Sequence, residues 1–295
     1  MTSVADTTAL GSLSSVDTDS DTAILIAALD EQASMPAIQR LRAAATELLG
    51  VRLDHRVVDV GCGTGDVARA LAGCVGPHGS VLGIEASETM LTEARPRAGT
   101  TTLPVEFRHG DITRLDLDDA SHDATLWERV FQHLAEPHAA MTELVRITRP
   151  GGRIVVIDTD WGLQAIHGAE PALTATIATA WPRSAANGLA GRQLPALLAD
   201  VGLPDPTVLA ERITSTDPLR PSLPPFTTMA AAAAHAGAVT PTEAHLWLEQ
   251  LADAGRRGHF FWALTTFVVA GNVPRHASQY VSLDPAAVPT AVVDK

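Results

Sequence analysis

The hydrophobic pattern of the chain changes its period sharply between residues 57 and 71. Val57, Val58 and Val60 form a short continuous apolar run, which is typical of a central parallel strand that is covered on both faces. From 67 to 71 the apolar spacing becomes helical. Three glycines separate the two stretches, and glycine lets the backbone turn tightly and lets a ligand approach its amides. The pattern therefore predicts a buried strand, a glycine turn and the N-terminus of a helix.

The same pattern predicts strands that alternate with helices along the rest of the chain. Apolar runs predict further strands at residues 80–84, 104–107, 122–127, 153–158, 207–213 and 259–269. Helical spacing predicts helices at residues 23–29, 35–49, 137–147, 171–181, 193–201, 229–236 and 242–254, and one more that begins near Ser87. This alternation favours an α/β fold with a largely parallel sheet.

The glycine turn carries residues that distinguish two classes of nucleotide ligand. A dinucleotide-binding turn needs a third glycine three positions after the second, and Asp66 stands at that position. A carboxylate there repels a pyrophosphate but tolerates a ligand with a positive end. The next predicted strand ends in Glu85, where an acidic residue can bind the two ribose hydroxyls. These residues indicate an adenosine-type ligand that has a cationic group and no phosphate.

The stretch around the glycine turn resembles a known enzyme family. Residues 59–65, Asp-Val-Gly-Cys-Gly-Thr-Gly, are similar to the first motif of the class I S-adenosylmethionine-dependent methyltransferases. Later pieces follow in the family's order at Glu85, 110–112, 123–134 and 149–152. The resemblance spans about residues 51–160 and is closest to the ubiquinone-biosynthesis-like branch, which methylates small molecules. It implies S-adenosylmethionine as cofactor and a doubly wound, Rossmann-like seven-stranded sheet, mostly parallel with an antiparallel last strand.

The resemblance also implies which residues bind the cofactor. Asp111 would accept a hydrogen bond from the adenine amino group, and Ile112 would cover the ring. Arg42, at the edge of the apolar face of the helix at 35–49, could reach the methionine carboxylate. The expected cofactor-binding residues are Arg42, Asp59, Gly61, Gly63, Gly65, Glu85, Ala86, Met90, Asp111, Ile112, Trp127 and Arg129. Three of them have a plainer alternative. Arg42 could be a solvated arginine beside a core face, Asp111 a turn residue beside glycine, and Trp127 a core aromatic instead of a ring that faces the sulfonium.

The crevice beyond the carboxyl ends of the strands supplies the candidates for catalysis, because ligands of open α/β sheets sit there. His133 follows the fourth predicted strand, and an imidazole titrates near neutral pH. It is therefore the first candidate for a base or an acceptor-orienting group, with Asp158, Asp160 and His167 as further candidates at the end of the fifth strand. The alternatives are a structural histidine and carboxylates that cap the following segment. The spacing of the histidines predicts no metal site.

Charge and hydropathy narrow the range of partners. The net charge of −13 opposes binding to nucleic acid, which needs a basic face, so we expect a small-molecule acceptor. No apolar run reaches the length of a membrane span, and the N-terminus lacks the basic and apolar regions of a signal peptide. We therefore expect a cytoplasmic protein without a membrane partner. The sequence leaves the oligomeric state open.

The chain divides into five predicted parts. These are a disordered arm at 1–20, N-terminal cap helices at 21–50, the cofactor-binding core at 51–160, a region at 161–258 that completes the core and adds a helical lid, and the last strand with a tail at 259–295. The lid would place Phe226, Met229, His235 and Trp247 in an acceptor pocket. Plain helix packing is the alternative for each of these four side chains.

These observations predict direct in-line transfer of the sulfonium methyl to an O, N or C atom of a small organic acceptor, a secondary metabolite. Positioning and exclusion of water then carry most of the catalysis, and an oxygen acceptor adds the need for a base. One alternative is a protein that keeps the fold and the cofactor but has a non-methylating or regulatory role. Another, a nicotinamide oxidoreductase, is opposed by Asp66.

Overall fold

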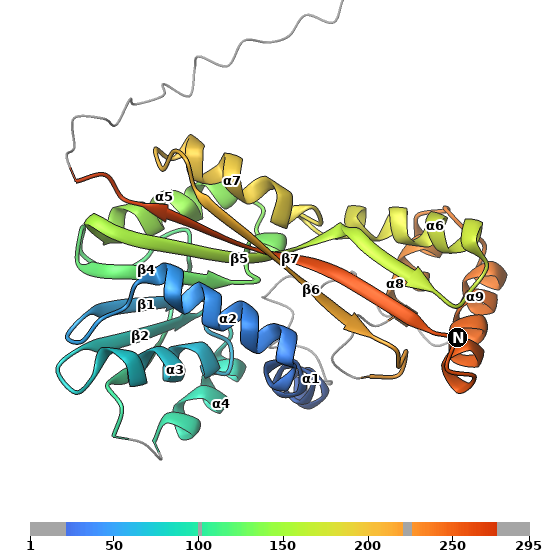
Figure 1. The fold of residues 1–295 in the computed structure, drawn as a ribbon, viewed down its shortest axis with the longest axis horizontal. Helices are drawn as coiled ribbons and strands as arrows, with labels where there is room; N and C mark the ends of the chain where they lie inside the picture. Colours follow the sequence, from blue (N-terminus) through green and yellow to red (C-terminus); the bar gives the residue numbers. More distant parts are fainter. Residues whose placement is uncertain (1–21, 100–101, 221–225, 276–295) are drawn as a thin grey trace, which may run out of the picture.

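The computed structural model describes residues 22–99, 102–220 and 226–275, and within these ranges a seven-stranded sheet carries helices on both faces (Figure 1). The predicted arm at 1–20 and residues 276–295 of the predicted tail lie outside the described residues. The strands are β1 (Arg56–Val60), β2 (Ser80–Glu85), β3 (Val105–His109), β4 (His122–Glu128), β5 (Thr148–His167), β6 (Thr207–Ser215) and β7 (Phe261–Asn272).

The strands follow the order β3-β2-β1-β4-β5-β7-β6. β1 to β5 pair in parallel, so that Val60 at the end of β1 lies beside Ile84 of β2 and Trp127 of β4. β7 runs antiparallel to both of its neighbours, β5 and β6. The strand order reverses between β1 and β4, and such a switch point is where an open α/β sheet leaves a crevice for a ligand. The topology confirms the predicted Rossmann-like fold with an antiparallel last strand.

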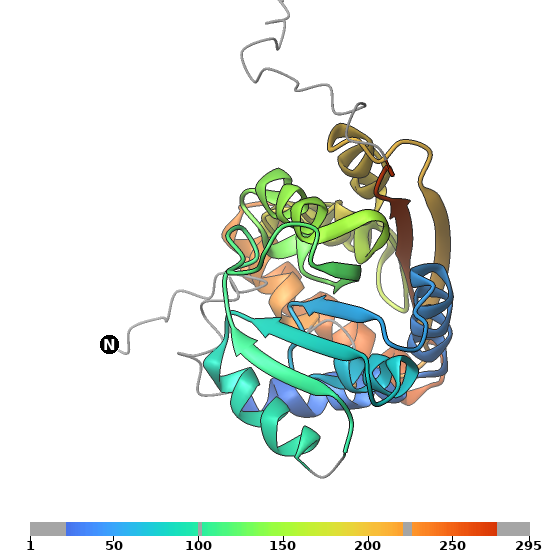
Figure 2. The same ribbon diagram turned by 90° about the vertical axis from the view of Figure 1, so that its left-hand side faces the viewer.

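The helices form two layers on the sheet. They are α1 (Thr22–Ser34), α2 (Pro36–Leu49), α3 (Asp66–Val75), α4 (Glu88–Ala98), α5 (Pro137–Ile147), α6 (Pro171–Ala180), α7 (Ala190–Asp200), α8 (Phe226–His235) and α9 (Pro241–Arg256), with short 3-10 turns η2 (Phe131–His133) and η3 (Trp181–Ser184). α2, α3 and α4 cover one face of the sheet, and α5 and α7 cover the other (Figure 2). Within the described ranges, no helix is both long enough and apolar enough to cross a membrane.

Burial on both faces explains the apolar run that predicted β1. Val57 packs into the core on the side of α2 and α3, whereas Val58 and Val60 pack into the core on the side of α5 and α7. All three are at most 1% exposed. Asp59 points to the α2 side between them, because successive side chains of a strand alternate between faces. The position of Asp59 in a strand that is covered on both faces therefore buries its carboxyl group beside the glycine turn.

β5 is much longer than the strand predicted at 153–158. It spans 148–167, and β4 accompanies it only as far as Ile157. Beyond that point β7 continues to pair with β5, with one irregularity between Asp160 and Ala165. The strand continues past its apolar run because β7 supplies a hydrogen-bonding ladder on one side. β5, β6 and β7 therefore project beyond the carboxyl ends of the other strands (Figure 1).

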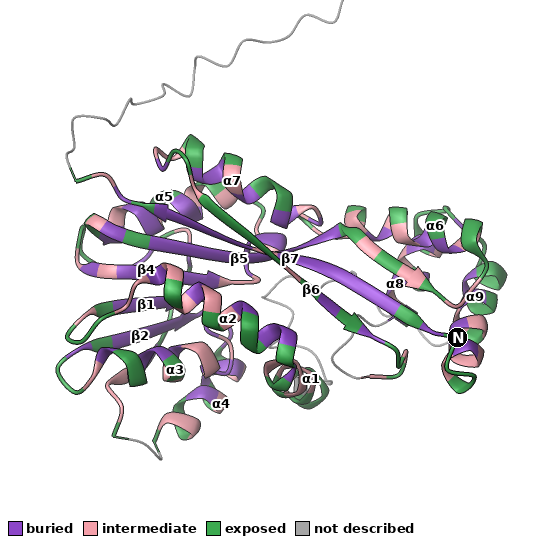
Figure 3. Ribbon diagram, viewed as in Figure 1, coloured by how far each residue is buried: buried purple, intermediate pink, exposed green. Residues whose placement is uncertain are grey.

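α6, α8 and α9 lie beside this projecting part and contribute buried residues to the core there (Figure 3). Met229 and Trp247 are 0% exposed, and the ring of Phe226 lies 5.9 Å from that of Trp247. The indole N–H of Trp247 donates to Thr174 Oγ1 at 3.0 Å. These contacts support plain helix packing for the three side chains instead of a pocket lining, and His235 is exposed at the end of α8.

Candidate active site

The three glycines of the turn after β1 differ in what surrounds them. All have positive φ, +70° at Gly61, +53° at Gly63 and +79° at Gly65. A Cβ at Gly61 would lie 2.2 Å from Val130 Cγ2, and one at Gly65 would lie 2.4 Å from the ring of Phe107. A Cβ at Gly63 would meet nothing within 4 Å. Gly61 and Gly65 therefore serve close packing, whereas Gly63 leaves its backbone open to a ligand.

Glu85, at the end of β2, shapes the turn through backbone hydrogen bonds. It is 4% exposed, and its Oε2 accepts from the Gly63 N–H at 2.9 Å. Oε1 accepts from the N–H groups of Ala86 at 2.9 Å and Ser87 at 3.0 Å. A carboxylate has about four lone-pair sites, so about one remains for a ligand. The expected contact with ribose hydroxyls therefore competes with the role of Glu85 in holding Gly63.

Asp59 is a buried carboxyl with an unpaired oxygen. It is 1% exposed, and within the described part of the chain its Oδ2 has no hydrogen-bond partner. Burial, followed by repulsion from Glu128, raises the pKa of Asp59 to about 7. A buried polar atom without a partner is costly, and a cationic ligand group would remove that cost. Asp59 and the open side of Gly63 together fit the positive end of S-adenosylmethionine.

Comparisons with known proteins agree with this geometry. Residues 58–156 match a family model described as a methyltransferase domain. The chain is 35% identical over 259 residues to an uncharacterized 37.1 kDa protein in transposon TN4556 of Streptomyces fradiae. This match covers 82% of the chain and 69% of the Streptomyces protein. It is also 35% identical over 111 residues to a demethylmenaquinone methyltransferase of Staphylococcus aureus. The chain belongs to the class I S-adenosylmethionine-dependent methyltransferases.

The share of each chain that a match covers decides whether the match supports a family or only a fold. The match to the S. aureus enzyme covers 38% of this chain and 46% of that enzyme, so it supports the ubiquinone-biosynthesis-like branch but spans less than half of that relative. The YcgJ protein of Bacillus subtilis shows the same fold, with a TM-score of 0.56, 17% identity and coverage of 81% of this chain and 100% of that one. A putative methyltransferase of Bacillus halodurans has the same fold, with a TM-score of 0.53 and 16% identity. The match covers 79% of this chain and 98% of that one. The methyltransferase identity and the S-adenosylmethionine cofactor are thus confirmed.

Arg42, predicted to bind the cofactor carboxylate, is engaged within the methyltransferase itself. From α2 it donates to both carboxylate oxygens of Glu128 at the end of β4, at 2.9 and 3.1 Å. Arg129, which follows Glu128 in the chain, has a left-handed φ of +58°. One terminal nitrogen of its guanidinium donates to the side chain of Gln32 in α1. Its Nε is buried and has no hydrogen bond to any described residue, although Glu128 lies 3.6 Å away. Arg129 is therefore better placed than Arg42 to receive a ligand carboxylate.

The remaining predicted cofactor residues differ in exposure. Asp111 is exposed, and its Oδ1 accepts from the N–H and the hydroxyl of Thr113, both at 2.8 Å, so this oxygen serves a local turn. Ile112 and Met90 are buried, and Ala86 is exposed. Trp127 is 0% exposed and packs within the core on the α5 side. That position supports the alternative of a core aromatic, and binding by the other residues stays a prediction.

His133 lies in η2, directly after β4. It is half-buried, and its Nδ1 has no hydrogen-bond partner among the described residues. Burial, together with the positive charge of Arg129, lowers the pKa of His133 to about 4. The expectation that this imidazole titrates near neutral pH is therefore corrected: its surroundings keep it uncharged at pH 7. A neutral imidazole can still accept one hydrogen bond and donate another.

The two aspartates at the end of the predicted fifth strand are held by protein groups. Asp158 is 0% exposed, and it accepts from the N–H groups of Gln132 at 3.2 Å and Thr159 at 2.8 Å. Burial raises the pKa of Asp158 to about 7. Asp160 forms a two-point ion pair with Arg192 of α7, one contact being 2.9 Å. The N–H groups of Thr159 and Gly162, which donate to Asp158 and Asp160, support the alternative that these carboxylates cap the following segment, and a part in proton abstraction stays a prediction.

His167 is not brought into this cluster. It is exposed and is the last residue of β5, paired with Phe261. Over this stretch the paired strand β7 advances four residues, from Thr265 to Phe261. A strand rises roughly 3.3 Å per residue, so His167 lies on the order of 13 Å beyond Asp160. The prediction that His167 shares the crevice fails because the fifth strand continues where the sequence pattern indicated its end.

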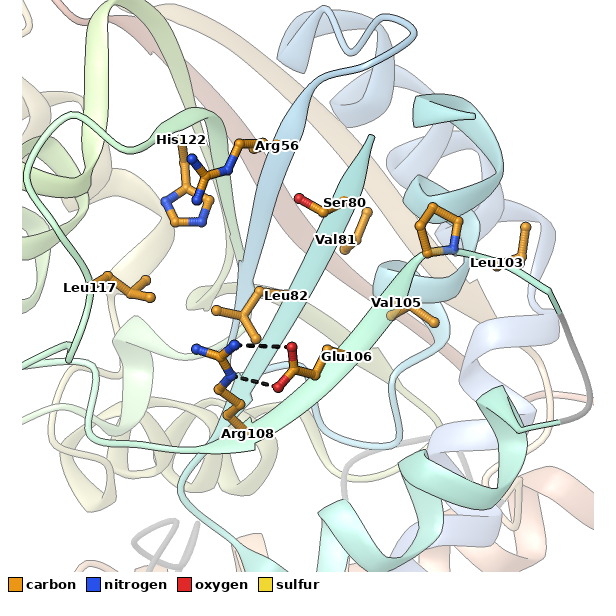
Figure 4. A pocket seen from close by; sticks show the side chains of 11 residues that line it. Arg56, Ser80, Val81, Leu82, Leu103, Val105, Glu106, Arg108, Leu117 and His122 are labelled. Atoms are coloured by element: carbon orange, nitrogen blue, oxygen red, sulfur yellow. Dashed lines mark hydrogen bonds and ion pairs between the residues drawn. The ribbon is translucent and has the colours of Figure 1, made fainter. Parts of the chain in front are cut away.

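A second depression in the surface lies away from the cofactor site. This groove has a volume of about 350 Å³ and is lined by the first residues of several strands, among them Arg56 of β1, Ser80 of β2 and His122 of β4 (Figure 4). Arg108 and Glu106, two positions apart on β3, pair with each other in its lining at 2.7 and 3.0 Å. Because parallel strands begin at this edge and end at the glycine turn, the groove lies at the opposite edge of the sheet.

Sequence reasoning missed two residues that hold the turn after β4. Gln132 is 5% exposed, and its Oε1 accepts from the indole N–H of Trp161 at 2.8 Å. Asn187 donates to backbone carbonyls of the same turn. The dipeptide Asn187-Gly188 predicts a turn. No local sequence pattern, however, predicts that this turn bonds to the segment after β4.

Proposed function

We propose that this methyltransferase moves the methyl group of S-adenosylmethionine to an O, N or C atom of a small organic acceptor, a secondary metabolite, in the cytoplasm. The observation that carries the proposal is the combination of the open side of Gly63 with the unpaired Oδ2 of Asp59. The net charge of −13 favours a small molecule over nucleic acid. The relative from S. aureus, a demethylmenaquinone methyltransferase, also bears the name of a small acceptor.

The residues of the chain would divide the work of binding. Asp59 would hold the positive end of the cofactor, Arg129 its carboxylate, and Glu85 one ribose hydroxyl while keeping Gly63 in place. The cofactor supplies a methyl group on an electrophilic sulfonium, so the protein mainly has to orient the acceptor and exclude water. His133 would orient the acceptor as a neutral hydrogen-bonding group, because its pKa is lowered to about 4. Asp158 and Asp160 would serve as anchors of the surrounding segments.

We further propose that α1 and the helical layer of α6, α8 and α9 form the acceptor lid. Three consecutive residues of α1 support this assignment because they bind three elements around the crevice. Asp30 accepts from Arg97 of α4 at 2.6 and 3.0 Å, and Gln32 accepts from Arg129 after β4. Glu31 accepts at 2.8 Å from Arg220, which follows β6. Exchange of residues 161–258 between relatives should then change acceptor choice and leave cofactor affinity nearly intact.

Incubation with methyl-labelled S-adenosylmethionine and a panel of metabolites, read by mass spectrometry, tests the proposed function. We expect one metabolite to gain the label and S-adenosylhomocysteine to form in equal amount. Cofactor binding without label transfer to any metabolite would favour the non-methylating alternative. His133→Ala should lower turnover by about a hundredfold, because the acceptor would lose the group that orients it toward the methyl. His138→Ala, at an exposed position on α5, serves as the matched control.

A further inference from the structure

The turn that carries His133 is held by one asparagine from a distant part of the chain. Asn187 lies between η3 and α7, and its Nδ2 donates to the carbonyl oxygens of Phe131 at 3.1 Å and of Leu134. Its backbone N–H donates to the Gln132 carbonyl at 3.1 Å. A single residue therefore satisfies three carbonyls of the turn that follows β4.

The opposite side of the turn is fixed as well. Asp158 accepts from the Gln132 N–H at 3.2 Å, and the side chain of Gln132 accepts from the indole of Trp161 at 2.8 Å. The backbone N–H of Trp161 donates to the Gly188 carbonyl at 3.0 Å. β5, the η2 turn and the segment of Asn187 thus close a ring of hydrogen bonds. Such mutual satisfaction of buried polar groups makes a segment rigid.

The imidazole of His133 contrasts with the backbone that carries it. The backbone N–H of His133 donates to Val130 at 3.0 Å, whereas its buried Nδ1 has no partner among the residues that the structure describes. A backbone held by several hydrogen bonds that carries a buried, unpaired ring nitrogen is suited to present that nitrogen to a bound molecule. Leaving such an atom unpaired is unfavourable in a protein that never binds anything there.

We infer that Asn187 is a positioning residue that holds the Phe131–Leu134 turn so that His133 meets the acceptor. This inference rests on the proposed function, because it takes His133 to be the group that touches the acceptor. Asparagine suits the position because its amide carries two donors and its backbone a third. Aspartate would turn a carboxylate toward two carbonyl oxygens. Alanine would remove the side-chain donor from both, and the Phe131 carbonyl would keep only the N–H of Leu134 at 3.1 Å.

Histidine side-chain NMR of ¹⁵N-histidine-labelled full-length protein tests the inference without knowledge of the acceptor, with the His133 signal assigned by its loss in His133→Ala. In the wild type we expect His133 to stay neutral until the pH falls to about 4. In Asn187→Ala the turn should open to water and away from Arg129, so that titration shifts toward an ordinary pKa of about 6.5. Asn187→Gln, which keeps both donors, should restore part of the difference. An unchanged His133 titration in Asn187→Ala would overturn the inference.

Two further measurements separate positioning from general destabilisation. Affinity for S-adenosylhomocysteine should stay within about twofold in Asn187→Ala, because the side chain and N–H of this asparagine bond, among the described residues, to the turn after β4 and not to the glycine turn. With an acceptor in hand, kcat should fall roughly 10- to 100-fold with little change in the cofactor KM. Asn272→Ala, at an exposed position at the end of β7, is the matched control and should change neither. Equal losses of kcat in the two variants, or a weakened affinity for S-adenosylhomocysteine in Asn187→Ala, would count against positioning.

If Asn187→Ala does not fold, Asn187→Ser and Asn187→Gln carry the same NMR measurement with smaller changes. Failure of the proposed function is recognised separately. Wild-type protein that does not bind S-adenosylhomocysteine, or that labels no metabolite, would refute the proposed function, while the NMR comparison still reports whether Asn187 controls the surroundings of His133.

Discussion

Substitution of Gly63 by alanine separates cofactor binding from folding. A Cβ at this position would meet nothing within 4 Å, so no steric clash is expected in the protein alone. Its φ of +53° costs a residue with a Cβ about 1–2 kcal/mol. The added methyl group would, however, occupy the space through which a ligand approaches the turn. We therefore expect Gly63→Ala to lower the free energy of unfolding by about 1–2 kcal/mol and to weaken S-adenosylhomocysteine binding at least tenfold, about 1.4 kcal/mol.

Urea unfolding and isothermal titration calorimetry measure the two effects on one preparation. Gly73→Ala is the matched control, since this glycine lies within α3 and also has nothing within 4 Å of its added Cβ. The control should gain about 0.5–1 kcal/mol of stability and bind as the wild type does. Gly61→Ala and Gly65→Ala should unfold far more readily, because their added atoms would lie 2.2 and 2.4 Å from side chains. Wild-type affinity in a folded Gly63→Ala would refute the idea that the ligand approaches the turn through the open side of Gly63.

Three other substitutions test the buried charges. Glu85→Ala should weaken S-adenosylhomocysteine binding and lower stability, each by roughly 1–3 kcal/mol, whereas Glu85→Gln should keep more of both in calorimetry and urea unfolding. Because the pKa of Asp59 is raised to about 7 from 3.8, its protonated form stabilises the fold fully below about pH 4, and that stability is lost as pH rises through 7. Asp59→Asn should therefore flatten this loss in urea unfolding between pH 4 and 8, while Asp116→Asn, at an exposed site, should leave it unchanged. Arg192→Ala should cost about 1–3 kcal/mol, reduced by the 46% exposure of this arginine, and a double-mutant cycle with Asp160→Asn should show that the loss comes from their pairing.

The sequence predicts the cofactor half of the protein well because its signals are local. An apolar run, three glycines and Glu85 all lie within 30 residues, and each reports a conformation that its own neighbours impose. The sheet follows from this pattern together with the family resemblance. Binding by individual residues stays a prediction.

The candidate catalytic residues were harder to predict because their surroundings come from distant segments. The pKa of His133 depends on burial under elements that the local pattern does not identify. Asp160 is neutralised by Arg192, 32 residues away, and Asn187 reaches a carbonyl 56 residues away. His167 was misplaced since β7, about a hundred residues later in the chain, extends β5. Long-range partners of this kind leave no periodicity in the sequence.

The uninterrupted course of β7 limits how the enzyme can open. Its 12 residues run without a break from the cofactor half to the helical layer. Bending this strand would break hydrogen bonds to both neighbouring strands, β5 and β6. We therefore expect that the two halves do not swing apart about a loop, and that the distance between the expected cofactor site and the proposed lid is set when the chain folds. With the lid that we propose, entry and exit of both ligands would depend on α1, which is held by partly exposed ion pairs that salt screens. Ionic strength should change how fast ligands enter and leave more than how they are aligned once bound.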